Sequence, residues 1–146
     1  MFDVICAGQA VIDCIIKSRE ETPYKENVFR AKALELHTGG DALNEAMALS
    51  SMGFDTALVC GLGNDLAGSV IIDESSKYDI NTERVRIVHG MPTPVANLNV
   101  ADDGSRYSVN SPATDLCGYR IAKEDLAGAK GVSFASIGRP PFADLP

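Results

Sequence analysis

The chain has 146 residues, of which 45% are hydrophobic and 23% are charged, as is typical of one globular domain. Its net charge of −7 argues against nucleic acid and anionic membranes as partners, because both attract basic proteins. No apolar run reaches the roughly 18 residues of a membrane span. The N-terminus lacks the basic start of a signal peptide, and none of the four cysteines forms a CxxC pair. We therefore expect a cytoplasmic protein in which Cys6 and Cys60 are buried free thiols.

The first half of the sequence alternates between strand-like and helix-like segments. Residues 2–8 form an apolar run that ends at a glycine, which predicts a buried strand, and residues 11–17 predict a second, more exposed strand. Residues 27–37 alternate between apolar and charged side chains. This pattern favours a half-exposed strand, although the same composition would also suit a helix. Residues 41–52 have apolar side chains at helical spacing.

Capping residues mark the ends of the predicted helices. Asp41 is the expected N-cap of the first helix, and Gly53 is suited to a left-handed C-terminal end. Residues 55–61 predict another buried strand. A second helix is predicted within residues 62–80, with Asn64 or the aspartate after it as N-cap. The alternation of strands and helices predicts an α/β domain with parallel strands.

The second half of the sequence begins with a predicted β-hairpin. Residues 93–110 contain two strand-like runs around an Asp-Gly turn. Alternation along the first run puts its apolar residues on one face and two amides, Asn97 and Asn99, on the other. A short helix is expected over residues 122–129 and a strand over residues 131–138. Because a parallel strand normally leads into a crossover helix, we expect that the chain stops in the middle of a fold.

The segment TGGDALNEA, which starts at Thr38, allows two interpretations. Gly39 and Gly40 suit a tight turn between a strand and a helix. The missing Cβ atoms would also let a ligand approach the backbone, beside the N–H groups of a helix N-terminus. Asn44 lies in the first turn of that helix, and its amide both donates and accepts hydrogen bonds, which suits sugar hydroxyls.

Other polar residues give weaker signals. Asp13 is either a surface carboxylate or, between apolar neighbours, an acceptor for two hydroxyl groups. Residues 61–68 fail the dinucleotide fingerprint because Leu66 stands where a glycine is required. His37 and His89 have no metal-binding partners in the sequence, so no metal site is predicted. Neither a Walker A loop nor a Gly-x-Ser-x-Gly motif is present.

Together these motifs resemble the first signature of the PfkB, or ribokinase-like, family of carbohydrate kinases. That signature has a glycine pair, an asparagine four residues later, a small residue, and then spaced glycines with an aspartate. The matching residues are Gly39, Gly40, Asn44, Ala46, Gly53, Gly63, Asp65 and Gly68. The segment AGQAVID, residues 7–13, resembles the opening strand of the family and puts Asp13 at the position of a sugar-binding aspartate.

The resemblance implies a ribokinase-like fold, in which a Rossmann-like parallel sheet flanked by helices carries a small β-sheet lid. The lid would comprise about residues 12–38 and 93–110 of a single, incomplete domain, 1–146. The implied substrate-binding residues are Asp13, Gly39, Gly40, Asn44, Asn97 and Asn110. The implied substrate is ribose, fructose or a sugar like 2-keto-3-deoxygluconate, and the lid would also form a homodimer.

The implied reaction transfers the γ-phosphoryl group of ATP to a sugar hydroxyl with the help of Mg²⁺. The family keeps its catalytic aspartate in a second signature that ends Gly-Ala-Gly-Asp, which does not occur in these 146 residues. We therefore expect that the chain carries the sugar-binding half of a kinase, lacks the ATP site, and is inactive alone. The alternative is a non-catalytic sugar-binding or regulatory protein derived from the same fold.

Overall fold

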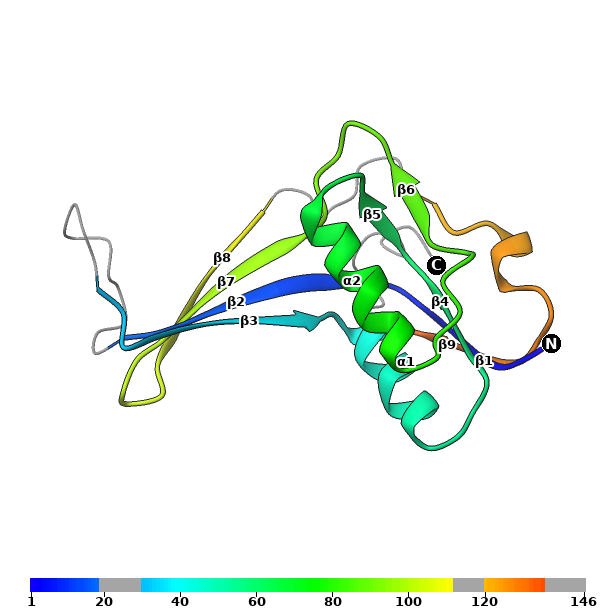
Figure 1. Cartoon of the computed structure of the whole chain (residues 1–146), viewed down its shortest axis with the longest axis horizontal. Coiled ribbons are helices and arrows are strands. Elements are labelled where there is room, and N and C mark those ends of the chain that lie inside the picture. Colours follow the sequence, from blue (N-terminus) through cyan, green and yellow to red (C-terminus); the bar gives the residue numbers. More distant parts are fainter. Residues whose placement is uncertain (19–29, 112–119, 136–146) are drawn as a thin grey trace.

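A computed structural model describes residues 1–18, 30–111 and 120–135. These residues form a parallel sheet with helices and a second sheet that projects from it (Figure 1). The elements are β1 (Phe2–Ala7), β2 (Val11–Lys17), β3 (Ala33–Gly39), α1 (Asp41–Ser51), β4 (Thr56–Val59), β5 (Gly61–Gly63), α2 (Leu66–Lys77), β6 (Arg86–Val88), β7 (Val95–Val100), β8 (Arg106–Asn110), the 3₁₀ helix η3 (Lys123–Leu126) and β9 (Ala129–Phe134).

The parallel sheet has β1 at its centre, between β4 and β9. Beyond β4 the parallel pairing continues through a bridge from Ala57 to Asn81, and then through β5 and β6. Strands β1 and β4 are nearly continuous apolar runs, as expected of parallel strands that are covered on both faces. The predicted α/β class with parallel strands is therefore confirmed, whereas β6 has no counterpart among the predicted elements.

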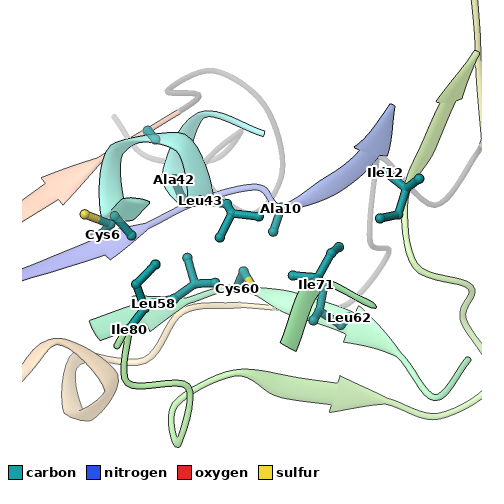
Figure 2. Close-up of a cluster of buried hydrophobic side chains, with 12 residues drawn as sticks. Cys6, Ala10, Ile12, Ala42, Leu43, Leu58, Cys60, Leu62, Ile71 and Ile80 are labelled. Carbon is teal, nitrogen blue, oxygen red and sulfur yellow. The ribbon is translucent and has the colours of Figure 1, made fainter. Parts of the chain in front are cut away.

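The main hydrophobic core lies between this sheet and the two helices. Figure 2 shows Leu43 of α1 and Ile71 of α2 beside Cys6, Leu58 and Cys60 of the sheet. All five side chains are fully buried. The opposite face of the sheet carries a second, smaller cluster, which packs against residues around η3. The two layers cover both faces of β1, and β1 leads directly into the second sheet.

The second sheet is called the lid sheet below and has the strand order β3-β2-β7-β8. Strands β7 and β8 pair antiparallel around the predicted Asp-Gly turn, so the expected hairpin is confirmed. Of the segment 27–37, which suited either a strand or a helix, residues 27–29 lie outside the described residues, and residues 33–37 belong to β3, which pairs antiparallel with β2 along its whole length. The lid sheet extends away from the parallel sheet to one side (Figure 1).

The start of α1 differs from the prediction. Gly40, not Asp41, is the N-cap, and Asp41 is the first helical residue. Gly40 has a φ of +92°, a left-handed conformation that aspartate rarely adopts. The left-handed glycine expected at the other end, Gly53, is confirmed by its φ of +90°. Asp65 caps α2 as one of the two predicted alternatives.

The segment near residue 125 also differs from the prediction. It is a single 3₁₀ turn, η3, rather than an α-helix, and β9 starts at Ala129, two residues before the predicted strand. Within the described ranges, no helix is long and apolar enough to cross a membrane.

Candidate functional site

Four residues of the lid sheet form one row across its strands. The register pairs His37 of β3 with Asp13 of β2, Asp13 with Ala96 of β7, and Ala96 with Asn110 of β8. Directly paired residues share a face of a sheet, so all four side chains lie on the same side. Neighbouring strands are about 4.8 Å apart, which puts Asn110 about 10 Å from Asp13 across the small side chain of Ala96.

Asp13 lies directly over Gly39. A Cβ atom at Gly39 would come within 2.1 Å of Asp13 Oδ2, so only glycine leaves room for the carboxyl group in its present position. Gly40 is confined by backbone instead, because its Cβ would lie 2.5 Å from the carbonyl oxygen of Gln9. The glycine pair therefore brings β3, the start of α1 and the β1–β2 connection together at the base of the lid sheet.

The N-terminus of α1 is already partly hydrogen bonded. The Ala42 N–H donates to the Gln9 carbonyl at 3.2 Å, whereas the Asn44 N–H makes the first intrahelical hydrogen bond, to the Gly40 carbonyl at 2.9 Å. Asp41 adds a negative charge to the first turn. The free N–H groups expected behind the glycine pair are thus fewer than a phosphate-binding helix would offer. The side chain of Asn44 is exposed to solvent at this end of α1.

Burial and a nearby histidine act in opposite directions on Asp13. Partial burial raises the pKa of the Asp13 carboxyl, and the neighbouring His37 opposes that effect. Beyond His37 on the same face, Glu35 Oε1 accepts a hydrogen bond from Lys17 Nζ at 2.5 Å. That bond, followed by the contact with His37, lowers the pKa of Glu35. Of these two carboxyl groups, Glu35 is stabilised in its charged form by Lys17, whereas burial disfavours the charged form of Asp13.

Asn97 is not brought to this site. It pairs with Cys14 of β2 and Val109 of β8, so it lies on the opposite face of the lid sheet from Asp13. Alternation along β7 correctly placed its amides and Ala96 on opposite faces. The face of β7 that lies on the same side of the sheet as Asp13 is the one with Ala96. Asn110 is on the Asp13 face, and its Oδ1 accepts a hydrogen bond from Ser108 Oγ at 2.7 Å.

A cavity between the lid sheet and the helices also lies away from Asp13. It has a volume of about 610 Å³ and separates the lid sheet from the two helices. Ile12, Leu36 and Thr38, which face away from Asp13, line one side of it, and Met47 and Leu66 line the other. His37 borders it from the edge strand β3. This cavity is apolar and does not contain the predicted sugar-binding residues.

A hydrogen-bonded network around Asp65 fixes the chain where it enters β7. Asp65 Oδ1 accepts from the Gly68 N–H at 2.9 Å and from Thr93 Oγ1 at 2.6 Å, while Oδ2 accepts from the Thr93 N–H at 2.7 Å. Gly63 and Gly68 border the network, and a Cβ at either would lie within 2.5 Å of a carbonyl oxygen. The second half of the signature therefore connects the start of α2 to the chain before β7 and does not form a ligand site.

Two features of the site were not predicted from the sequence. His37 had no assigned role, because its pairing with Asp13 depends on the register of β2 and β3. The partnership of Asp65 with Thr93 joins residues 28 positions apart. No sequence motif predicts either contact, although an aspartate at a predicted helix start does predict a capping role.

The part of the chain that the structure describes contains no cluster of three His, Cys, Asp or Glu residues that could hold a metal ion. Cys6, Cys14 and Cys60 are free thiols. Burial raises the pKa of Cys6 to about 11 and that of Cys60 to about 12, so neither is a nucleophile at neutral pH. The chemistry that these residues offer is recognition of hydroxyl groups by a carboxylate and amides.

Known proteins are similar to this chain in sequence and in fold. The chain is 22% identical over 123 residues to a fructokinase of Rhizobium leguminosarum bv. trifolii, a match over 84% of this chain and 34% of the relative. An Arabidopsis thaliana ribokinase complexed with ribose and ATP superposes with a TM-score of 0.72 at 21% identity, over 85% of this chain and 41% of that one. A nucleoside kinase of Methanocaldococcus jannaschii gives a TM-score of 0.74 at 18% identity, over 92% and 44%.

These structural similarities establish a ribokinase-like fold. The chain spans between about a quarter and a third of the length of the curated relatives it matches. The family described as pfkB family carbohydrate kinase matches residues 1–137, which is nearly the whole sequence. The chain therefore belongs to the pfkB family of carbohydrate kinases.

Proposed function

We propose that this protein acts in the ATP-dependent phosphorylation of a sugar hydroxyl, and that residues at the base of its lid sheet bind the sugar. The observation that carries this proposal is the position of the Asp13 carboxyl group, half-buried and directly over Gly39. An ionised carboxylate only accepts hydrogen bonds, so it suits a ligand that donates from hydroxyl groups.

The surrounding residues support binding of a polyhydroxylated ligand. Gly39 leaves room for the Asp13 carboxyl group and Gly40 for the backbone of Gln9, so the glycine pair lets the carboxyl group take its position at the start of α1. The Asn110 amide N–H groups can donate to a hydroxyl, because its Oδ1 already accepts from Ser108. We include Asn44 for its exposed amide beside the glycine pair. We leave out Asn97, which faces the other side of the lid sheet.

We assign the role of phosphoryl donor to ATP. One of the similar structures is the ribokinase of Arabidopsis thaliana complexed with ribose and ATP. ATP and Mg²⁺ would supply the transferred group and the compensation of its charge. The first turn of α1 does not fit that pair, since it carries Asp41 and its Ala42 N–H donates to the Gln9 carbonyl. The part that we assign to the described residues is to bind and orient the sugar. The cytoplasm, where ATP is available, is the compartment we propose.

Calorimetric titration of the purified protein with D-ribose, D-fructose and 2-keto-3-deoxygluconate tests this function. We expect saturable binding of at least one sugar, weakened at least about tenfold in Asp13→Asn, because a hydrogen bond to a charged group is lost. Asp103→Asn, in an exposed turn of the lid sheet, is the control. Unchanged affinity in Asp13→Asn would contradict the proposal. Sugar binding without sugar-dependent ADP formation would favour the alternative of a non-catalytic binding protein.

We also propose that two copies associate through the face of the lid sheet opposite Asp13. Strands β3 and β8, at the two edges of the sheet, present four exposed apolar side chains on that face: Leu34, Leu36, Tyr107 and Val109. Exposed apolar side chains of this kind, on the face opposite Asp13, are typical of an interaction surface. Association through this face leaves the sugar side of the lid sheet accessible.

A further inference from the structure

His37 lies on the outer flank of the Asp13 carboxyl group. The two residues pair directly across β2 and β3 and share a face of the lid sheet. The carboxyl group leans away from His37, since it fills the space above Gly39, which is two residue pairs closer to α1. The His37 side chain is 54% exposed. A ligand held over Gly39 by Asp13 therefore has His37 as its next neighbour along β3.

The orientation of the His37 ring is set by a charged neighbour. Its Nε2 lies 3.4 Å from Glu35 Oε2, and the other oxygen of Glu35 is held by Lys17 Nζ at 2.5 Å. In a neutral imidazole one nitrogen donates and the other accepts, and the partner of the donor selects the tautomer. With Nε2 donating to Glu35, Nδ1 is the acceptor that remains for a ligand.

We propose that His37 is a specificity-determining residue of the sugar site, whose Nδ1 accepts a hydrogen bond from the hydroxyl group next to the one that Asp13 holds. This inference rests on the function proposed above. The carboxylate of Asp13 and the Nδ1 of His37 are both acceptors, so together they select a sugar with two neighbouring hydroxyl groups that donate in the same direction. A sugar that lacks one of these hydroxyls leaves an acceptor without a partner, and it is discriminated against for that reason.

Three variants test the role of Nδ1 in binding of D-ribose and D-fructose by calorimetry. His37→Ala removes the acceptor, and we expect affinity to fall about three- to tenfold, the effect of one neutral hydrogen bond. His37→Asn places an amide oxygen near the position of Nδ1, and we expect affinity within about twofold of the wild type. His89→Ala changes the other histidine of the chain, outside the lid sheet, and should leave affinity unchanged.

A second set of titrations identifies the hydroxyl. The better-binding sugar is replaced by each of its monodeoxy analogues, and each analogue is titrated into wild type and His37→Ala. One analogue should bind both proteins equally well, because its missing hydroxyl is the partner of His37. Circular dichroism establishes whether the variants are folded. If His37→Ala does not fold, His37→Asn provides the test of Nδ1.

The outcomes separate this inference from the proposed function. If the wild type binds none of the sugars, both the function and the role of His37 are overturned. If Asp13→Asn weakens binding but His37→Ala does not, the sugar site stands and the role of His37 is wrong. If His37→Ala and His37→Asn weaken sugar binding equally, the role of His37 is also wrong, because restoring an acceptor would then not restore affinity.

Discussion

Gly39 and Gly40 are adjacent in the sequence, but different neighbours confine them. The space above Gly39 is filled by the end of a side chain, the Asp13 carboxyl group, which can rotate away. The space beside Gly40 is filled by the backbone of Gln9 and Ala10, which cannot move independently. Gly40 also has a φ of +92°. The glycine pair therefore combines a functional requirement at Gly39 with a structural one at Gly40.

We predict that the two glycines respond differently to alanine. Gly39→Ala should fold but displace the Asp13 carboxyl group, so that sugar affinity falls about as far as in Asp13→Asn. Gly40→Ala should lower the free energy of unfolding by roughly 1–3 kcal/mol, the usual range for a strained residue. Thermal unfolding and sugar titration of both variants measure these effects. A Gly39→Ala protein that binds sugar normally would show that Asp13 does not need its present position.

Asp13 itself should reduce stability at neutral pH. Its pKa is raised by burial above the ordinary value of 3.8, so the folded state binds its proton more tightly than the unfolded state does. Its contribution to stability is therefore present below pH 3.8 and lost as pH rises through the folded pKa. We predict that Asp13→Asn has a higher Tm than the wild type at pH 7, and that the difference disappears toward pH 3.5.

Asp3 provides the matched control for that pH series. Its pKa is lowered, first by a hydrogen bond from Lys130 and then by the Asp55 N–H. A carboxylate of this kind stabilises the fold above its unfolded pKa, and the stabilisation is lost as pH falls through the folded pKa. Asp3→Asn should thus have a lower Tm than the wild type at pH 7, the opposite of Asp13→Asn. A lowered Tm in both variants would contradict the assignment for Asp13.

At the scale of elements, helix α2 depends on one side chain for both its start and its attachment to the lid sheet. Asp65 caps the Gly68 N–H and binds the N–H and hydroxyl of Thr93, which is buried. Burial by itself would raise the pKa of Asp65, but the hydrogen bonds from Thr93 and Gly68 outweigh it and lower the pKa.

We predict that Asp65→Ala lowers the free energy of unfolding by about 1–3 kcal/mol at pH 7, because a cap and a buried partner are both lost. The stabilisation by a carboxylate with a lowered pKa is lost as pH falls through the folded pKa, so the difference from wild type should shrink below about pH 4. Thr93→Val and the double variant complete a cycle. Additive effects of the two substitutions would show that the Asp65–Thr93 contact contributes little.

The lid sheet shows how far local pattern determines an element. Alternation identified both strands of the hairpin and correctly separated Asn97 from the apolar residues of β7. Whether Asn97 or Asn110 shares a face with Asp13 depends on which residues pair across β2, β7 and β8, and a shift by one residue exchanges the faces. That register is set by packing between distant segments, so local pattern could not assign it.

At the scale of the whole molecule, the face of the lid sheet opposite Asp13 should control the association of two copies. Leu36 of the edge strand β3 is 74% exposed on that face, and Met52 is 73% exposed at the end of α1. We predict that the wild type sediments as a dimer, that Leu36→Glu sediments as a monomer, and that Met52→Glu remains dimeric. Burial of a charge in an apolar interface is strongly unfavourable, whereas Met52 lies outside the lid sheet. A monomeric wild type would exclude this interface.

The sequence by itself determined the family, the α/β class, most strands and both α-helices, because these depend on local periodicity and on one signature over residues 39–68. It also predicted Asp13, Gly39 and Gly40 as site residues, since Asp13 lies in the opening segment 7–13 and the glycines lie in that signature, and neither position depends on strand pairing. Only the tertiary structure decided that Asp13 lies over Gly39, that His37 flanks it, and that Asn97 faces away. These contacts join segments far apart in the chain, and strand register and core packing fix them together.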